Sequence, residues 1–100
     1  MKNELSQKSI VETLKKEKNF LASEFGVLSI GLFGSFSRGE DVVDSDIDIL
    51  VELKEPSFDR LSGLLIYLEQ KFGKRIELIR KSNKNIGHFI RKIEKDVIYA

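Results

Sequence analysis

The stretch VLSIGLFGSFSRGEDVVDSDIDILVEL, residues 27–53, decides the fold of this chain. Its two ends, residues 27–33 and 47–53, are short and apolar, and runs of this length and composition predict two strands. Between them lies a polar loop that begins at Gly34, and we expect a turn of helix to open within it. The stretch therefore predicts two strands that bring a glycine-containing loop and several acidic residues close together.

On either side of this stretch, apolar residues recur at three- and four-residue steps, which is the periodicity of helices. Residues 5–25 are expected to form one or two helices that end at Gly26, and residues 58–72 a helix that ends at Gly73. A strand is expected at 75–80. A last helix, capped by Ser82 or Asn83, is expected to carry Ile86, Phe89, Ile90, Ile93 and Val97. This alternation predicts an α/β (α+β) domain with one small sheet and helices packed against it.

The composition indicates one domain without a strong overall charge. At 100 residues the chain has room for one hydrophobic core, so we expect a single domain over residues 1–100. Lys and Arg number 17 against 16 Asp and Glu, which gives no general attraction to nucleic acid, and direct nucleic-acid binding is not expected. The chain has no cysteine and no stretch near the ~20 apolar residues that span a bilayer. We therefore expect a cytoplasmic protein that does not use a membrane.

Two aspartates stand at the start of the second predicted strand. Asp46 and Asp48 are two residues apart, so on a strand both side chains leave the same face with their Cα atoms ~6.6 Å apart. No Lys or Arg lies within residues 40–53 to neutralise them, and a divalent metal would relieve their repulsion. Mg²⁺ suits such a pair, and Glu77 on the next strand is a candidate third ligand. Alternatively, Asp46 caps a turn, and Asp48 and Glu77 are solvated strand residues.

The loop before the aspartates has the features of a phosphate-binding turn. Gly34 and Gly39 permit close backbone approach, while Ser35 and Ser37 offer hydroxyl groups and N–H groups near a helix start. Arg38 can add a charge-assisted contact to a phosphate. The alternative is an ordinary strand-to-helix turn. With the aspartates ten residues on, the loop favours a site for a metal-bound nucleoside triphosphate.

Two other phosphate- or metal-binding motifs are excluded by spacing. A Walker A loop needs a lysine after its second glycine, whereas Glu40 and Asp41 follow here. An EF-hand loop needs a glycine at its sixth position, where this chain has Ile49, and its flanks would be helices rather than strands. Neither a P-loop ATPase nor an EF-hand protein is therefore expected.

With G-S-x-x-R-G at 34–39 and S-D-I-D-I-L-V at 45–51, the chain resembles the minimal nucleotidyltransferase family of the DNA polymerase beta superfamily. The resemblance extends over nearly the whole chain, including the closing I-E-K-D-V-I-Y-A. It implies the nucleotidyltransferase fold, a single small mixed sheet with helices packed against it. Gly34 and Ser35 would hold the β and γ phosphates of ATP, with Arg38 and Gly39 in the same nucleotide-binding loop.

The resemblance also implies a metal site and a reaction. Asp46 and Asp48 would each contact one or both of two Mg²⁺ ions, and Glu77 would hold the metal on the acceptor side. Attack of an acceptor hydroxyl on the α-phosphorus of ATP would transfer AMP and release pyrophosphate. Glu77 departs from the family pattern, because the third carboxylate is usually an aspartate. Residues 1–100 leave no room for the helical second domain that larger relatives use for the acceptor, so we expect the acceptor to come from elsewhere.

Members of this family resemble the antitoxin half of a two-gene module whose toxin is a HEPN-domain ribonuclease. The resemblance therefore implies adenylylation of a tyrosine on a HEPN-domain toxin partner. One alternative is an antitoxin that acts by contact alone, and another is a small-molecule nucleotidyltransferase, which needs an acceptor pocket. Phe36 and Tyr67 are either partner contacts or local packing, and packing is favoured for Tyr67. We expect His88 and Lys92 to be surface residues rather than catalytic groups.

Overall fold

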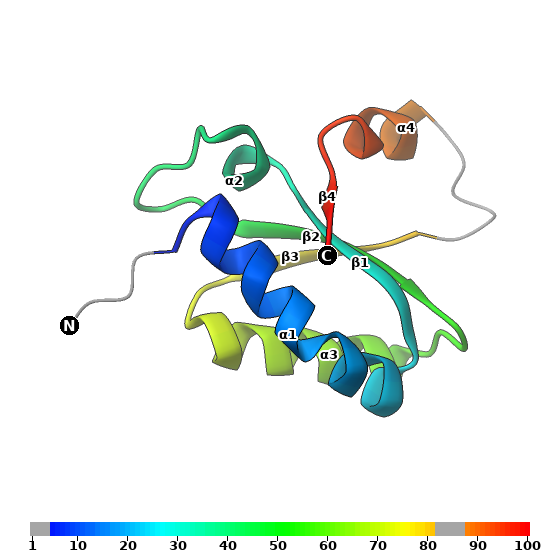
Figure 1. Ribbon diagram of the computed structural model, residues 1–100. Coiled ribbons are helices and arrows are strands. Elements are labelled where there is room, and N and C mark those ends of the chain that lie inside the picture. The colour runs from blue at the N-terminus through cyan, green and yellow to red at the C-terminus, as the bar shows by residue number, and fades with distance from the viewer. Residues whose placement is uncertain (1–4, 82–87) are drawn as a thin grey trace.

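The computed structural model describes residues 5–81 and 88–100 (Figure 1). The elements in chain order are α1 Gln7–Phe25, β1 Val27–Phe33, α2 Ser35–Arg38, β2 Ile47–Leu53, α3 Phe58–Phe72, β3 Ile76–Arg80, α4 His88–Glu94 and β4 Ile98–Tyr99. The helices and strands expected up to residue 80 are confirmed, with bounds that differ by two residues or fewer. No helix among the described residues has the length and apolar character needed to span a membrane.

The four strands form one mixed sheet in the order β3-β2-β1-β4. β1 pairs antiparallel with both β2 and β4, while β2 and β3 are parallel. A parallel pair needs a crossover connection, and α3 provides it between β2 and β3. The expected class, a small mixed sheet with helices packed against it, is confirmed.

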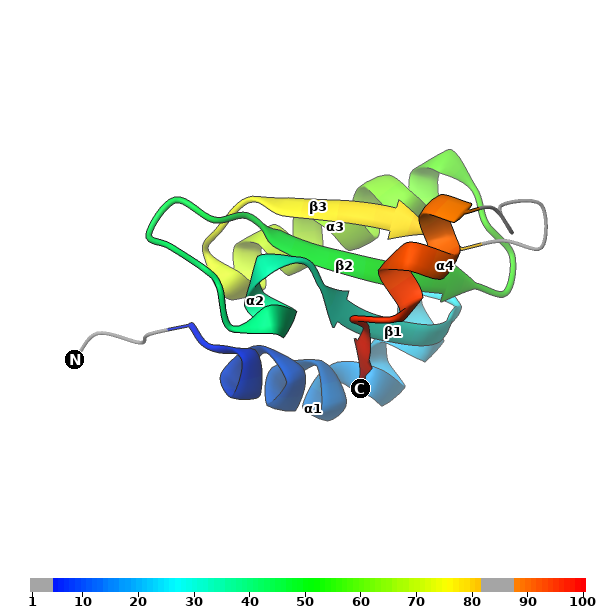
Figure 2. The ribbon, with the colours of Figure 1, turned by 90° about the horizontal axis from the view of Figure 1, so that it is seen from above.

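One face of the sheet, here called the helical face, is covered by α1 and α3 (Figures 1 and 2). Ile47, Ile49 and Val51 of β2 point to this face and are fully buried in the main apolar cluster. Ile10 and Leu14 of α1 are also fully buried there. Burial of these side chains supplies most of the hydrophobic stabilisation of the domain.

The opposite face, here called the site face, carries α2 and α4 (Figure 1). Leu50, the apolar residue that interrupts the alternation in β2, points to this face and packs with Ile90 and Ile93 of α4. β2 is therefore covered on both sides, which explains why its sequence is apolar at successive positions. The apolar cover on the site face is much smaller than that on the helical face.

The two aromatic residues singled out from the sequence are packing residues. Phe36 is buried in the main cluster, with 3% of its surface exposed. The Tyr67 ring lies 5.0 Å from Phe20 and 6.0 Å from Phe25 between ring centroids. Its hydroxyl donates a hydrogen bond to the carboxylate of Glu17 on α1. Packing was favoured for Tyr67 and is confirmed.

The C-terminal end of the chain differs from the sequence prediction. The last helix ends at Glu94 rather than reaching Val97, and a fourth strand follows it. In that strand Tyr99 pairs with Gly31, and the Ala100 N–H donates to the carbonyl of Ile30 over 2.9 Å. The expectation of a helix through Val97 is wrong, because these backbone groups pair with the open edge of β1. Ser82, Asn83 and Ile86 lie outside the described residues.

Candidate functional site

The strand register brings two acidic residues together on the site face. Asp48 of β2 is paired with Glu77 of β3 in the parallel ladder. The neighbours of Asp48 along the strand are buried in the main cluster on the helical face, so Asp48 points to the site face. Ile76 and Leu78 likewise belong to the helical face, which leaves Glu77 beside Asp48. The fold therefore places these two carboxylates side by side.

The carboxyl group of Asp48 lies in an unfavourable environment for a negative charge. The pKa of Asp48 is raised to about 6, mainly by partial burial, with its hydrogen bond to Glu77 acting in the same direction. The negative charges of Glu77 and Asp46 contribute to this rise, whereas the Arg38 guanidinium opposes it. A carboxylate at this position is stabilised by a proton or by a cation.

Asp46, Asp48 and Glu77 carry carboxylate oxygens, which are the kind of ligand that Mg²⁺ prefers. Asp46 precedes β2 and is close enough to Asp48 for their charges to interact. Among the described residues, no group of three or more acidic, histidine or cysteine side chains is arranged to hold a metal by itself. Mg²⁺ commonly takes one or two carboxylates from the protein and completes its octahedron with water and substrate phosphate. The arrangement therefore suits an ion that arrives with a nucleotide.

Gly34 places the loop backbone directly against Asp48. Its φ is 78° and its ψ is −155°, a conformation that L side chains rarely adopt. A Cβ atom added to Gly34 would lie 1.9 Å from Asp48 Oδ2, which is well inside any permitted contact. Only glycine therefore allows β1 to turn into α2 across the carboxylate.

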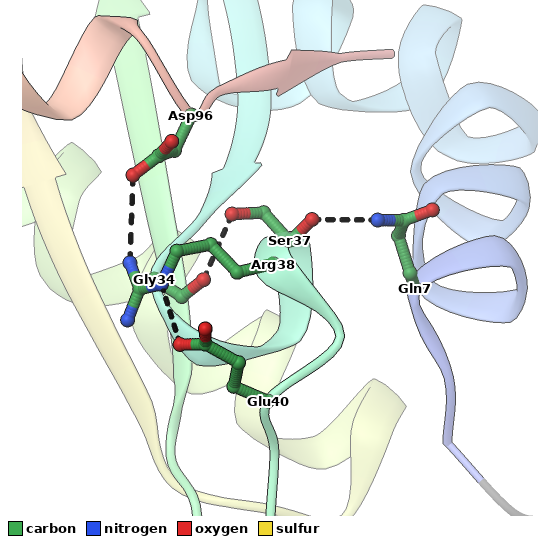
Figure 3. A network of polar contacts seen from close by, with 6 residues as sticks. All are labelled: Gln7, Gly34, Ser37, Arg38, Glu40 and Asp96. Atoms are coloured by element: carbon green, nitrogen blue, oxygen red, sulfur yellow. Dashed lines mark hydrogen bonds and ion pairs between the residues drawn. The ribbon is translucent and has the colours of Figure 1, made fainter.

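The short helix α2 is held in place by several hydrogen bonds (Figure 3). The Ser37 hydroxyl donates to the carbonyl of Gly34 over 2.8 Å, and the N–H groups of Ser37 and Arg38 donate to the same carbonyl. From α1, Gln7 Nε2 donates to the Ser37 carbonyl over 2.6 Å. The hydroxyl and N–H groups of Ser37, which we expected to be offered to a phosphate, are used for hydrogen bonds within the loop in this structure.

Ser35 and Gly39 lie at the two ends of α2. Ser35 is the first residue of α2 and is half-buried. Gly39 ends α2 with a φ of 70°, and no atom lies within 4 Å of the Cβ position it lacks. Gly39 thus serves the turn, whereas Gly34 serves both the turn and the close approach to Asp48.

Arg38 lies on α2 beside two carboxylates that the sequence analysis did not assign to the site. Its Nε is 2.9 Å from Glu40 Oε1, and its Nη1 is 3.5 Å from Asp96 Oδ2 (Figure 3). The hydrogen bond with Glu40 is the main reason that the pKa of Arg38 is raised. Glu40 follows closely in the chain, but Asp96 is 58 residues away, so no local pattern could associate it with Arg38.

An open groove of about 970 Å³ lies between the start of α1, the loop after α2 and the end of α3. Its lining includes Leu5, Phe36, Val42 and Phe72. Phe36 and Phe72 pack with the main cluster, so this groove lies at the end of that cluster. It does not adjoin the carboxylates, and it gives no support to a small-molecule acceptor pocket beside Asp48.

Comparison with known proteins places this arrangement among nucleotide-transferring enzymes. Residues 14–100 match the family described as nucleotidyltransferase domain. Protein adenylyltransferase MntA of Thermococcus cleftensis is 40% identical over 97 residues, covering 96% of this chain and 97% of the relative. A candidate protein adenylyltransferase of Methanocaldococcus jannaschii is 43% identical over 94 residues, covering 91% of this chain and 94% of the relative.

Solved structures share the fold at lower sequence identity. A candidate minimal nucleotidyltransferase superposes with a TM-score of 0.74 at 23% identity, covering 97% of this chain and 98% of that chain. A toxin-antitoxin structure with AMP-PNP superposes with a TM-score of 0.65 at 20% identity, covering 95% of this chain and 72% of that chain. These likenesses establish the fold.

Proposed function

This chain belongs to the nucleotidyltransferase domain family and is a nucleotidyltransferase, and we propose that it transfers AMP from ATP to a hydroxyl group of a toxin protein. The observation that carries this proposal is the contact between Gly34 and Asp48, beside Glu77. It brings a loop suited to phosphate and a pair of carboxylates suited to Mg²⁺ into one place.

The acceptor class is inferred from the relatives. The 40% identical relative from Thermococcus cleftensis is named a protein adenylyltransferase, and it matches this chain over nearly its whole length. Structural neighbours are described as toxin-antitoxin complexes, one of them with AMP-PNP. We therefore propose that the acceptor is a tyrosine on a HEPN-domain toxin and that the chain acts as the antitoxin.

The nucleotide is proposed to bind along the loop that begins at Gly34. The backbone at Gly34 and Ser35 would hold the β and γ phosphates, since the lack of a side chain at Gly34 lets this backbone lie directly against Asp48. Arg38 would contribute positive charge to the triphosphate. Asp46 and Asp48, with Glu77, would hold two Mg²⁺ ions, which would supply positive charge to the triphosphate and to the leaving pyrophosphate.

The reaction exchanges one phosphorus–oxygen bond for another. The acceptor oxygen bonds to the α-phosphorus as the bond from that phosphorus to the bridging oxygen breaks, and pyrophosphate leaves. Glu77 is exposed at the edge of the site and is proposed to take the acceptor proton. Its exposure is consistent with an acceptor that is delivered by another protein.

A titration of ATP, with and without Mg²⁺, into wild type and the Asp46→Asn, Asp48→Asn double variant tests the site. We expect Mg²⁺-dependent binding by wild type and its loss in the double variant. The Asp41→Asn, Asp44→Asn double variant is a matched control, since it removes the same charge from the preceding loop. Equal binding by all three proteins would reject Asp46 and Asp48 as nucleotide-site residues.

Incubation of wild type with Mg·ATP and the toxin encoded beside it tests the acceptor. We expect the mass of the toxin to increase by whole AMP units, with the modification on tyrosine. Neutralisation of the toxin by the Asp46→Asn, Asp48→Asn variant, without any mass increase, would instead establish an antitoxin that acts by contact.

A further inference from the structure

Arg38 connects the site loop to the C-terminal end of the chain. Figure 3 shows its guanidinium group between Asp96 and Glu40. The Glu40 contact is 2.9 Å and the Asp96 contact is 3.5 Å. All three side chains are partly exposed, between 42% and 65%. Arg38 can therefore meet a ligand while it is held by these carboxylates.

The backbone of Asp96 is held in place by the elements on either side of it. Its N–H donates to the carbonyl of Ile93 over 3.0 Å, in the turn that ends α4. Two residues later β4 begins and pairs with β1, the strand that leads into Gly34. Asp96 is therefore attached to the sheet on one side and to α4 on the other. Glu40 is fixed more locally, since its N–H donates to the Ser35 carbonyl over 2.8 Å.

The two contacts leave donors of Arg38 available. An arginine side chain has five N–H donors, and the contacts with Glu40 and Asp96 use two of them, on Nε and Nη1. A free arginine has about 2 kcal/mol of rotamer entropy, part of which must be lost when it binds a phosphate. The contacts with Glu40 and Asp96 already restrict the Arg38 side chain, so less rotamer entropy is lost when it binds a phosphate. Arg38 also interacts electrostatically with Asp48, so its charge reaches the centre of the site.

We propose that Asp96 is a positioning residue for triphosphate binding, which holds the Arg38 guanidinium over the loop that begins at Gly34. The inference rests on the proposed function, because it requires that Arg38 meets the triphosphate. It adds a residue from the C-terminal turn to a site otherwise built from the loop and the first residues of β2 and β3. The short strand β4, which keeps Asp96 in place, thereby contributes to nucleotide affinity.

A double-mutant cycle with Arg38 tests this proposal. We expect Asp96→Asn to raise the dissociation constant of Mg·ATP about threefold, the size expected for loss of a partly exposed ion pair. In the Arg38→Met background, Asp96→Asn should cause no further change. Affinity for AMP, which lacks the β and γ phosphates, should be the same with and without Asp96→Asn. Asp96→Glu should restore most of the affinity for Mg·ATP.

Asp44→Asn is the matched control, because it also removes one negative charge near the site but does not contact Arg38. Weaker binding by Asp96→Asn than by Asp44→Asn supports positioning. Equal or tighter binding by Asp96→Asn overturns it, as does a loss that persists in the Arg38→Met background. Asp96 has a structural role if Asp96→Asn lowers the melting temperature of the nucleotide-free protein and weakens AMP binding as much as Mg·ATP binding. That result would also overturn the proposal. If wild type does not bind Mg·ATP, the proposed function itself fails.

Discussion

The two faces of the sheet differ in what covers them. On the helical face, α1 and α3 bury a large apolar cluster, in which Ile10 and Leu14 are inaccessible to solvent. On the site face, the apolar cover formed by residues 5–81 and 88–100 is a small cluster around Leu50. The rest of that face carries Asp48 and Glu77 beside the Gly34 loop. The comparison indicates that stability comes mainly from one face, whereas the other accommodates charges that oppose folding.

The sharpest test of this difference is a matched pair of isoleucine truncations. Ile10→Ala on the helical face should lower the free energy of unfolding by about 3 kcal/mol, because Ile10 is fully buried in the large cluster. Ile90→Ala on the site face should cost about 2 kcal/mol, the low end for such truncations, because its cluster is small and 6% of its surface is exposed. Urea unfolding of both variants measures the two values. Equal losses would show that the faces contribute alike.

Gly34→Ala should reduce activity through a change on the site face alone. The new methyl group would meet Asp48 Oδ2 at 1.9 Å, so the loop or the carboxylate must move. We expect AMP transfer to fall about a hundredfold, since misplacement by about 1 Å can cost that much. The assay is transfer of labelled AMP to the toxin.

Gly73→Ala is the control for this variant, because Gly73 has a φ of 63° but no atom within 4 Å of its missing Cβ. Because Gly73 has the αL conformation, Gly73→Ala should introduce a backbone strain of order 1 kcal/mol and leave transfer normal. Similar transfer by the two variants would mean that the contact with Asp48 is unimportant.

Asp48→Asn should stabilise the metal-free protein while it removes activity. The pKa of Asp48 is about 6 in the folded chain against an ordinary value of 3.8. A raised pKa means that its contribution to stability is fully present below about pH 3.8 and is lost as pH rises through about 6. After allowance for solvent screening, the gain from Asp48→Asn should be about 1 kcal/mol at pH 8 and near zero at pH 3.5.

Thermal or urea unfolding of wild type and Asp48→Asn in the presence of a chelator, across this pH range, measures the difference. Asp59→Asn, at the exposed start of α3, controls for removal of a charge. If Asp48→Asn is less stable than wild type at pH 8, the Asp48 carboxylate stabilises the site face. That result would contradict the inference that the charges on this face oppose folding.

The smallest expected effect concerns a polar contact on the helical face. Tyr67→Phe removes the hydrogen bond from Tyr67 to Glu17 but retains the ring that packs with Phe20 and Phe25. The free energy of unfolding should fall by about 0.5 to 1 kcal/mol. Lys71, which lies 3.3 Å from Glu17, remains as a partner of the carboxylate. Transfer should be unchanged, and a reduced rate would show that this face is coupled to the site.

Most of the fold could be predicted because its signals are local. The apolar run at 27–33, the helical periodicity at 58–72 and the glycines that end α1 and α3 each act over a few residues. Asp46 and Asp48 could be singled out because they are close in the sequence, although Asp46 lies just before β2 rather than within it. The fourth strand was not predicted, because Ile98 and Tyr99 are too few to form a pattern and β4 exists only by pairing with β1.

The sequence by itself determined the order of the elements up to β3, the acidic residues at the start of β2 and the glycine loop before them. The tertiary structure decided which of these meet. It aligned Asp48 with Glu77, placed Asp48 against Gly34, used Ser37 within the loop and brought Asp96 to Arg38. Periodicity and capping depend on neighbours in the chain, whereas these contacts depend on strand register and on the packing of distant segments. A single sequence carries no local signal for them.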